Sequence, residues 1–467
     1  MKDIKVDVVI IGGGTAGTFC ALHLVRKGFK VALIEKTSKI GGALVNSLVY
    51  PTAGFHTLSG KYIYSPLSFE FIKRSIENGL SKGHIRDPLN FAHTITPINP
   101  LSYKIIAKEL MNNDNFLFLP FSSIKNIDHK NFDVKYVDLI SNGESYRIFS
   151  NFFVDASGIL ITSFFLPIEY FFDYQNIQAF SLLFKVSNVN FEKCIKDIKN
   201  NPNDFYHKTD VELMEKQNFL SVSGYFSLAK EFFNNSELKI KRDRFLFFSF
   251  MDKDTVLVNT TRLFLEDLLK DTPKVENDVR QNELKDDKLL LNKAEVRGYG
   301  LLLKQVFYIH KIMKENIGAF RDSFISDIAD MVGIRQWRNV KGEFVLSVDD
   351  VVKGVFFDDT IAVGTWPIDI HTGKGIVEKN VNEDGYGIPF RSCISNFKNL
   401  VFIGKNISAD NYAFSSLRIQ GTMMIMGENI GRIIEYCLKR KTNFINLNYS
   451  EIKKTVEFKV LDTSPEL

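Results

Sequence analysis

Residues 6–35 read VDVVIIGGGTAGTFCALHLVRKGFKVALIE. Residues 8–11 form a short run of β-branched side chains, which is typical of a parallel strand that is buried on both faces. A glycine-rich turn follows, and residues 16–27 then read as a helix. A second apolar strand, residues 30–34, ends at an acid, Glu35. This stretch therefore predicts a strand–helix–strand unit, around which a parallel sheet is built.

The glycines of the turn have the spacing G-x-G-x-x-G, at Gly12, Gly14 and Gly17. The first allows a tight turn, the second lets the backbone approach a pyrophosphate, and the third lets helix and strand pack closely. The helix N-terminus attracts the anion. Glu35, which lies 18 residues past Gly17, can accept hydrogen bonds from a ribose diol and would repel a 2′-phosphate. We expect a dinucleotide other than NADP, rather than a purely structural turn.

Composition places the chain among ordinary globular proteins. Its 467 residues are 45% hydrophobic and 24% charged, and the length predicts two intimately joined domains. The net charge of +4 gives no case for nucleic-acid binding. The first glycine turn begins at Gly12, which leaves no room for a signal peptide, and no apolar run approaches the ~18 residues of a membrane span. We expect a cytoplasmic protein.

Cysteines and histidines suggest neither a disulfide centre nor a metal site. The four cysteines are scattered without a C-x-x-C pair, so reduced and buried thiols are the simpler interpretation. His56 and His93 have no ligand-like spacing to other residues, so no metal is expected.

The middle of the chain predicts two further sheets. Residues 134–139 and 145–149 can pair as a hairpin across Asn142-Gly143. Irregular segments and short elements that cover an active site are expected for residues 50–100. The segments predicted to form an antiparallel sheet are residues 180–186, 219–226, 244–251 and 255–260.

Other segments of this region have less specific patterns. Residues 152–155 predict a buried strand that ends in the three small residues Ala156-Ser157-Gly158. For the apolar and aromatic segment 159–172, packing in the core is favoured over an exposed patch that binds a partner or a hydrophobic substrate. Residues 271–287 predict a solvated loop, and residues 294–316 a helix with one apolar face.

The last third of the chain holds several distinctive motifs. They are Ile334-Arg335 with Arg338, Asp369-Ile370-His371, Tyr386-Gly387-Ile388-Pro389, and a strand from Asn399 to Gly404 followed by Ser408 and Arg418. A helix then begins near Thr422.

Together with the opening turn, Gly41-Gly42 and Ala156-Ser157-Gly158, these motifs resemble the FAD-dependent oxidoreductase family of the glutathione-reductase-2 type, related in fold to p-hydroxybenzoate hydroxylase. The resemblance covers nearly the whole chain. It implies an α/β fold, in which a Rossmann-like FAD-binding domain with a parallel sheet and helices on its faces is interleaved with an α+β substrate domain on an antiparallel sheet. The expected FAD-binding domain is residues 1–165 and 380–440, the substrate domain 166–379, and a C-terminal extension 441–467.

The resemblance also implies which residues hold FAD. The strand ending at Gly404 would approach the ribityl chain, and the helix near Thr422 would direct its positive N-terminus to the flavin N1/O2 edge. The expected cofactor-binding residues are Gly12, Gly14, Thr15, Ala16, Gly17, Glu35, Lys36, Gly41, Gly42, Ala156, Ser157, Gly158, Gly404, Arg418 and Thr422.

A histidine is the first candidate for the catalytic base. His371 suits proton transfer near neutral pH, and Asp369, two residues earlier on a strand, would share its face and orient the imidazole. A purely structural histidine is the alternative.

Arg335, Arg338 and Arg391 are candidates to anchor a substrate carboxylate through bidentate contacts. Alternatively, some of them pair with an acid or with the pyrophosphate; the acids considered are Asp349, Asp350 and Asp369.

The expected activity is that of a dehydrogenase or oxidase, which oxidises or desaturates a small organic molecule by hydride transfer to flavin N5. No second G-x-G-x-x-G appears downstream, so a nicotinamide domain is not expected. A monooxygenase is the first alternative, weakened by Gly404-Lys405 where aromatic hydroxylases usually have Gly-Asp; the W-x-W-x-I-P signature of halogenases is absent. A non-catalytic flavin- or nucleotide-binding interaction protein is the second. A homo-oligomer is possible.

Overall fold

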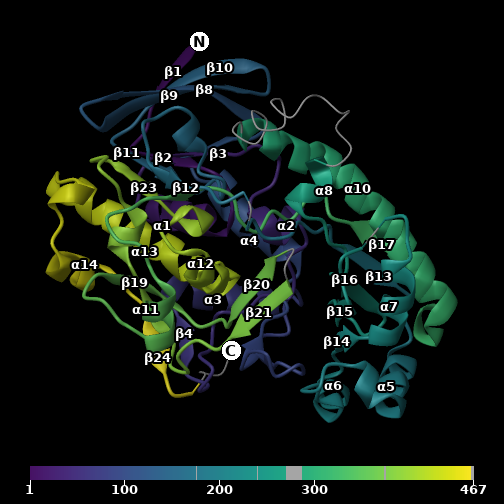
Figure 1. The fold of residues 1–467 in the computed structure, drawn as a ribbon. Helices are drawn as coiled ribbons and strands as arrows, with labels where there is room; N and C mark the ends of the chain where they lie inside the picture. Colours follow the sequence, from purple (N-terminus) through teal and green to yellow (C-terminus); the bar gives the residue numbers. More distant parts are fainter. Residues whose placement is uncertain (175, 239, 270–286, 373–374, 464–467) are drawn as a thin grey trace.

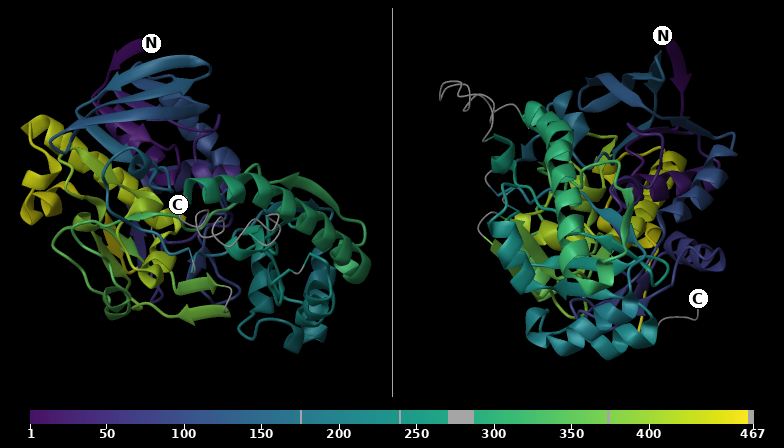
Figure 2. Two further views of the ribbon diagram at one scale, coloured as in Figure 1. Left: turned by 45° about the horizontal axis from the view of Figure 1, so that its top comes forward. Right: turned by 90° about the vertical axis from the view of Figure 1, so that its right-hand side faces the viewer.

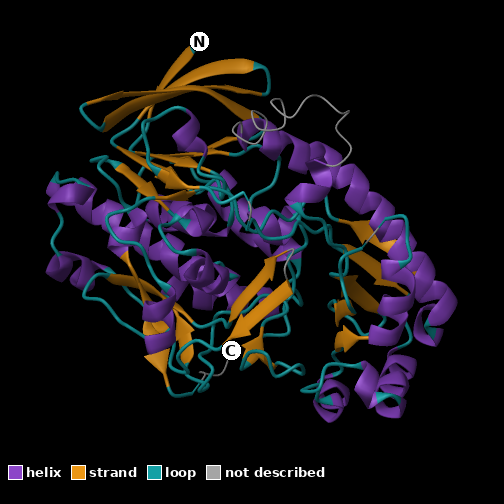
Figure 3. Cartoon of the chain, viewed as in Figure 1, coloured by secondary structure: helices purple, strands orange, loops and turns teal. Residues whose placement is uncertain are grey.

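The computed structural model describes residues 1–174, 176–238, 240–269, 287–372 and 375–463. Within these residues the protein has a parallel sheet in one half and an antiparallel sheet in the other. Figure 1 shows the two halves side by side, and Figure 3 shows helices around both sheets. The predicted fold class, α/β with a parallel and an antiparallel sheet, is confirmed.

The parallel sheet has the strand order β23-β11-β2-β3-β7. Its strands are β2 (Val8–Ile11), β3 (Val31–Ile34), β7 (Phe116–Leu119), β11 (Phe152–Asp155) and β23 (Leu400–Phe402). The strands β2, β3, β11 and β23 were expected, and all four are buried along their whole length. β23 comes from the last quarter of the chain and pairs with β11, so the two ends of the sequence build one sheet.

The two faces of the parallel sheet have different covers because side chains alternate along each strand. Val8 and Ile10 pack with the helices α1 (Thr15–Arg26) and α13 (Gln420–Arg440). Val9 and Ile11 pack against a second sheet instead of a helix. Its described strands, in spatial order, are β1 (Lys2–Lys5), β10 (Glu144–Phe149), β9 (Asp133–Ser141) and β8 (Ser122–Lys130). The predicted hairpin across Asn142-Gly143 is its β9–β10 turn.

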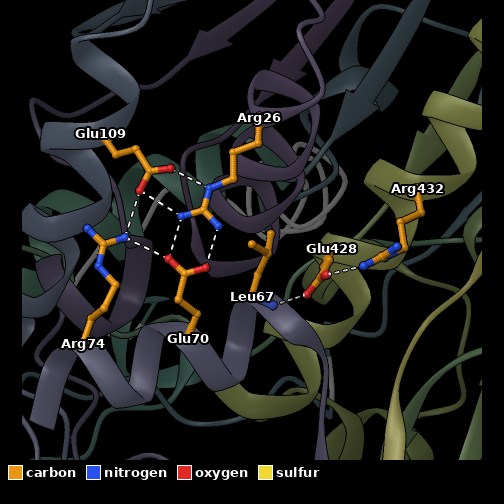
Figure 4. A network of polar contacts seen from close by, with 7 residues as sticks. All are labelled: Arg26, Leu67, Glu70, Arg74, Glu109, Glu428 and Arg432. Atoms are coloured by element: carbon orange, nitrogen blue, oxygen red, sulfur yellow. Dashed lines mark hydrogen bonds and ion pairs between the residues drawn. The ribbon is translucent and has the colours of Figure 1, made fainter.

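A network of charged side chains anchors the helices beside the parallel sheet (Figure 4). Arg26 at the end of α1 binds Glu70 of α3 (Pro66–Glu77) and Glu109 of α4 (Tyr103–Met111). Glu428 of α13 is fully buried and accepts a hydrogen bond from the backbone nitrogen of Leu67, 2.9 Å away, at the start of α3. The contact ties α13 to α3.

Residues 50–100, expected to hold irregular segments and short elements, include the 12-residue helix α3. Ser65 and Ser68 form a capping box at its N-terminus, and Pro66 occupies the first turn, where its missing N–H is not needed. The helix has a well-defined start that the surrounding Gly- and Pro-rich sequence conceals.

The antiparallel sheet has the order β14-β15-β16-β13-β17. Its strands are β13 (Phe184–Ser187), β14 (Ser221–Gly224), β15 (Phe245–Ser249), β16 (Thr255–Val258) and β17 (Phe324–Ile328); the first four were expected and β17 was not. The long helix α10 (Asp287–Asn316) packs on this sheet through Leu302, Val306 and Ile309, as its apolar face predicts. Figure 2 shows α10 lying across the sheet.

Two sequence predictions concern segments next to α10. Of the predicted solvated loop 271–287, residues 271–286 lie outside the described residues, and Asp287 is the buried first residue of α10. In the aromatic segment 159–172, Leu160, Leu166 and Ile168 are buried core residues. Its last residues are more exposed, so core packing holds for the first part of the segment.

Residues 346–370 belong to the core of the parallel-sheet half. Val351 and Ile361 pack in that core, and β19 (Thr360–Gly364) lies against α13. We therefore propose that the division between the domains falls near residue 345 rather than at residue 379. The C-terminal residues add α14 (Tyr449–Thr455) and β24 (Lys459–Leu461), which pairs with β4 (Tyr62–Tyr64).

Candidate active site

The glycine turn after β2 has no room for side chains at two of its positions. Gly12 has a φ of +105°, and a Cβ there would lie 2.5 Å from the carbonyl oxygen of Ala156. A Cβ on Gly17 would lie 2.1 Å from the carbonyl oxygen of Gly12. Gly14 differs, since the nearest atom to its Cβ position is 3.9 Å away. Gly14 is also the N-cap of α1, with no side-chain cap in the described structure. The turn thus leaves amide groups and open space for an anion.

Glu35 is held at the same turn. Its carboxylate is 7% exposed; Oε2 accepts a hydrogen bond from the Gly13 nitrogen at 2.7 Å, and Oε1 accepts from the Thr37 nitrogen at 2.9 Å. The acid at the end of β3 therefore fixes the turn, beside its proposed role toward a ribose.

Further predicted cofactor residues meet around the start of α1. The Gly41 nitrogen donates to the Gly13 carbonyl at 2.7 Å, and a Cβ on Gly42 would lie 2.7 Å from the Cα of Gly14. From the far end of the chain, the Cβ position of Gly404 lies 3.7 Å from the Cβ of Ala16. The fold therefore brings residues 12–17, 41–42 and 404 together.

The N-terminus of α13 is the second helix start in this region. Gly421 and Thr422 are buried, and no side-chain cap is present there among the described residues. The Gly421 nitrogen donates to the Ala53 carbonyl at 2.9 Å, and a Cβ on Gly54 would lie 3.1 Å from the Thr422 nitrogen. The positive end of the helix dipole at this start suits a ligand edge that carries negative charge. Sequence reasoning missed Ala53 and Gly54, although two small residues in a row were a usable signal for a close backbone contact.

Three other residues that were predicted to bind the cofactor make polar contacts with protein groups through their side chains. The hydroxyl of Thr15 lies 2.9 Å from that of Tyr103 and also bonds Gln420. Lys36 forms an ion pair with Glu295 of α10, which links the two halves of the molecule. The Ser157 hydroxyl accepts a hydrogen bond from the Ile161 nitrogen at 3.0 Å. Their roles toward a cofactor stay predictions.

The three arginines expected at the catalytic centre are not brought together. Arg338 is buried and makes a bidentate ion pair with Asp287. Its guanidinium carbon lies 3.9 Å from the ring centroid of Phe164. Arg391 binds the buried Asp359 through its Nε at 3.0 Å. Neither acid is among those that the sequence suggested as partners.

Arg335 instead belongs to a cluster of cations with Arg418 and Lys405. Arg335 donates to the Ala179 carbonyl and to the Ser181 hydroxyl, and burial together with Arg418 lowers its pKa to about 10. Arg418 donates to Gln178 Oε1 and to the Asp369 carbonyl, and burial lowers its pKa to about 10.

Lys405 follows Gly404 and is directed toward the antiparallel-sheet half. Its Nζ donates to the Ile334 carbonyl at 2.6 Å, and its Cε lies 2.9 Å from the Cβ position of Gly158. Burial, followed by the charges of Arg418, Lys36 and Arg335, lowers the pKa of Lys405 to about 8. The cluster of Arg335, Arg418 and Lys405, hereafter the cation cluster, therefore concentrates positive charge beside Gly158 and Gly404.

Asp369 faces the cation cluster. It lies on β20 (Ile368–Thr372), a strand as predicted, and its charge raises the pKa values of Arg335 and Arg418 against the effect of burial. The side chain of His371 lies outside the described residues, so its role as a base stays a prediction.

The described residues include four buried cysteines, no group of candidate metal ligands and no helix that could cross a membrane. All four cysteines are free and buried, and burial raises the pKa of each thiol, so none is a reactive thiolate. No group of candidate metal ligands occurs in the described ranges. None of the helices described here combines the length and the apolarity that crossing a membrane requires.

The whole-chain comparison agrees with this geometry. The family model described as FAD dependent oxidoreductase matches residues 7–456. The chain belongs to this family. Its cofactor is FAD, and the uncapped starts of α1 and α13 with the glycines between them fit that dinucleotide. The resemblance found in the sequence is thereby confirmed.

Matches to individual proteins are short. A thiamine thiazole synthase of Desulfosudis oleivorans is 37% identical over 69 residues, 14% of this chain and 27% of that protein. A dihydrolipoamide dehydrogenase of Chaetomium thermophilum is 36% identical over 73 residues, 16% of this chain and 14% of that protein. The chain thus spans less than a third of the length of these relatives.

Solved structures match most of the chain at low sequence identity. A geranylgeranyl bacteriochlorophyll reductase-like protein of Thermoplasma acidophilum is 10% identical, with 97% of this chain and 82% of that chain covered and a TM-score of 0.46. The flavin-dependent monooxygenase PieE, solved with FAD and substrate, is 12% identical, with 94% and 59% covered and a TM-score of 0.45.

Proposed function

We propose that the protein is a dehydrogenase or oxidase that oxidises or desaturates a small organic substrate. FAD supplies the hydride acceptor, and it gains negative charge when it accepts a hydride. The observation that carries the proposal is the cation cluster beside Gly158 and Gly404.

The cation cluster suits this chemistry for an electrostatic reason. Positive groups that are already in place stabilise a negative charge without reorganisation, and their effect is larger where water is excluded. The uncapped N-terminus of α13 adds a positive dipole end in the same region. Lys405 has the strongest effect if it remains charged, which its pKa of about 8 permits near neutral pH.

Other flavin chemistries are less well supported. Lys405 stands where aromatic hydroxylases usually have an aspartate, which counts against a monooxygenase. The buried and unpaired thiols count against a disulfide reductase. A protein that only binds flavin would gain nothing from partly burying several cations, which is energetically unfavourable.

The test begins with the visible absorption spectrum of the purified protein, before and after release of the cofactor. Twin flavin bands that bleach under anaerobic conditions when small organic substrates are added, without NAD(P)H, would support the proposal. Reduction only by NAD(P)H, with oxygen then incorporated into the product, would show a monooxygenase instead. A bound flavin that no substrate reduces would favour the non-catalytic alternative.

A variant tests the role of the cation cluster. We expect Lys405→Met to lower the reduction potential of bound FAD by about 30 mV, equivalent to about 1.4 kcal/mol for two electrons. Lys398→Met, which removes an exposed lysine, is the matched control and should leave the potential unchanged.

A further inference from the structure

One end of the antiparallel sheet carries three arginines that are far apart in sequence. Arg242 precedes β15 and Arg262 follows β16. These strands are antiparallel neighbours, and the Asn259 nitrogen donates to the Leu246 carbonyl at 2.8 Å, so the start of β15 and the end of β16 lie together. Arg335 reaches the same end, and the charges of Arg262 and Arg335 both act on Arg242.

Two bridges place Arg335 there. Phe180 pairs with Leu263, next to Arg262, and Ser181 pairs with Gly333, two residues before Arg335. The Arg335 guanidinium donates to the Ser181 hydroxyl at 2.9 Å.

This end of the sheet faces the parallel-sheet half, where FAD binds. Arg418, next to α13, donates to Gln178 Oε1, and the Met331 nitrogen donates to the Asn46 carbonyl at 2.9 Å. Asp369 acts electrostatically on Arg262, Arg335 and Arg418 alike. The arginines therefore continue the cation cluster toward the antiparallel sheet.

Arg242 is a buried arginine whose charge is not balanced by an ion pair with a described residue. Its side chain is 9% exposed, its Nε has no hydrogen-bond partner, and no described acid forms an ion pair with it. The adjacent Asp243 is bound through both oxygens by Arg244, at 2.8 and 2.9 Å. Burial, followed by the charges of Arg262 and Arg335, lowers the pKa of Arg242 well below its ordinary value. A buried guanidinium without an acid is unfavourable unless an anion binds it.

A second polar group at this end also lacks a partner. Gln178 is 1% exposed, and while its Oε1 accepts from Arg418, its Nε2 donates to no described group. An N–H donor beside several arginines matches the acceptor oxygens of an anion.

We propose that Arg242, Arg262 and Arg335 bind a carboxylate of the substrate, so that the substrate is a small organic acid. The inference rests on the proposed function and assigns the substrate class of the same site. A guanidinium can bind a carboxylate by donating two parallel hydrogen bonds, and the Nε–H donor of Arg242 has no partner among the described residues. Arg338 and Arg391, which the sequence suggested for this role, are already held by Asp287 and Asp359.

Binding can be measured without turnover. The FAD-loaded protein is titrated with benzoate and with succinate, and with the neutral amides benzamide and succinamide, while the visible flavin band is followed. We expect a saturable change with at least one of the two carboxylates and none with its amide. In Arg242→Met the affinity for that carboxylate should fall about tenfold or more, the loss expected of a charged hydrogen bond. Arg321→Met, at an exposed arginine, is the control.

Stability provides an independent readout. Because Arg242 is a buried charge without an acid, Arg242→Met should raise the melting temperature of the protein while it weakens carboxylate binding. Arg242→Lys should retain part of the binding. Equal binding of carboxylate and amide, no effect of either carboxylate on the flavin band, or unchanged affinity in Arg242→Met would overturn the inference.

The inference and the proposed function can fail separately. Neutral substrates that bleach the flavin, with no carboxylate binding, would overturn only the assignment of the substrate class. Carboxylates that bind through Arg242, in a protein whose flavin no substrate reduces, would overturn only the oxidative function.

Discussion

Gly427 of α13 lies directly against the carbonyl oxygen of Ala16 in α1: a Cβ on Gly427 would be 2.2 Å from that oxygen. One turn later, a Cβ on Gly431 would be 3.0 Å from the Cβ of His23. The two helices therefore touch backbone to backbone, which holds both of their N-termini in register beside the cofactor site.

Gly427→Ala should force α1 and α13 apart. We expect a loss of about 1–3 kcal/mol in the free energy of unfolding, as for an overpacked core, and a lower share of bound FAD after purification. Gly300→Ala on α10 is the control, because nothing lies within 4 Å of the Cβ position there. It should stabilise the protein by about 0.5–1 kcal/mol. A Gly427→Ala protein with the same free energy of unfolding and the same content of bound FAD as the wild type would contradict the backbone contact.

Glu35→Gln should weaken FAD binding. The carboxylate accepts hydrogen bonds from Gly13 and Thr37 through its two oxygens, whereas an amide must present an NH₂ group to one of them. We expect the dissociation constant of FAD, measured by fluorescence titration, to rise about tenfold or more. Glu169→Gln, at a side chain that is 81% exposed, should leave it unchanged. Unaltered affinity in Glu35→Gln would show that the acid does not organise the turn.

Arg338→Met should destabilise the protein, because we expect Arg338 to have a structural role rather than to bind the substrate. Its side chain and that of Asp287 are 6% and 8% exposed, so the variant leaves a buried carboxylate unpaired. The free energy of unfolding, from urea titration, should fall by about 3–5 kcal/mol, and Arg338→Met with Asp287→Leu should recover most of it.

The exposed pair Lys353–Asp349 is the control for this ion pair: Lys353→Met should change stability by about 1 kcal/mol or less. If Arg338 anchors the substrate instead, the variant will raise KM with little loss of stability.

His56 should make the protein sensitive to acid. Burial, and then the charges of His93 and Arg86, lower its pKa from 6.5 to about 4. Between these values the unfolded chain binds the proton more readily than the folded one, so this contribution to stability is complete above pH 6.5 and is lost as the pH falls toward 4. At about pH 5 the loss is about 2 kcal/mol.

His56→Gln should reduce the difference in unfolding free energy between neutral pH and about pH 5. His207→Gln, at an exposed histidine, should leave that difference as in the wild type. An equal acid response in the wild type and in His56→Gln would remove His56 as its source.

Local patterns were sufficient to predict the strand–helix–strand unit. The buried run Val8–Ile11, the spacing of Gly12, Gly14 and Gly17, and Glu35 lie within thirty consecutive residues, and their geometry depends on backbone angles and side-chain alternation that neighbours along the chain determine. The resemblance of motifs in order extended this to the family and to FAD.

Contacts between distant residues could not be predicted in this way. From the sequence, Arg335, Arg338 and Arg391 were equally good candidates to bind a substrate carboxylate. In the structure Arg338 pairs with Asp287 and Arg391 with Asp359, while Arg335 belongs to the cation cluster. Which acid reaches which arginine depends on how α10 and the strands pack.

The sequence alone thus determined the fold class, the cofactor and the geometry of the glycine turn, because these depend on short stretches with strong local constraints. Only the tertiary structure placed Arg242, which belongs to no motif, at the end of the sheet beside Arg262 and Arg335, without an ion pair to any acid of the described residues. Strand pairing between β15 and β16 decides that neighbourhood, and burial decides its energy; neither quantity is contained in the residues around Arg242 themselves.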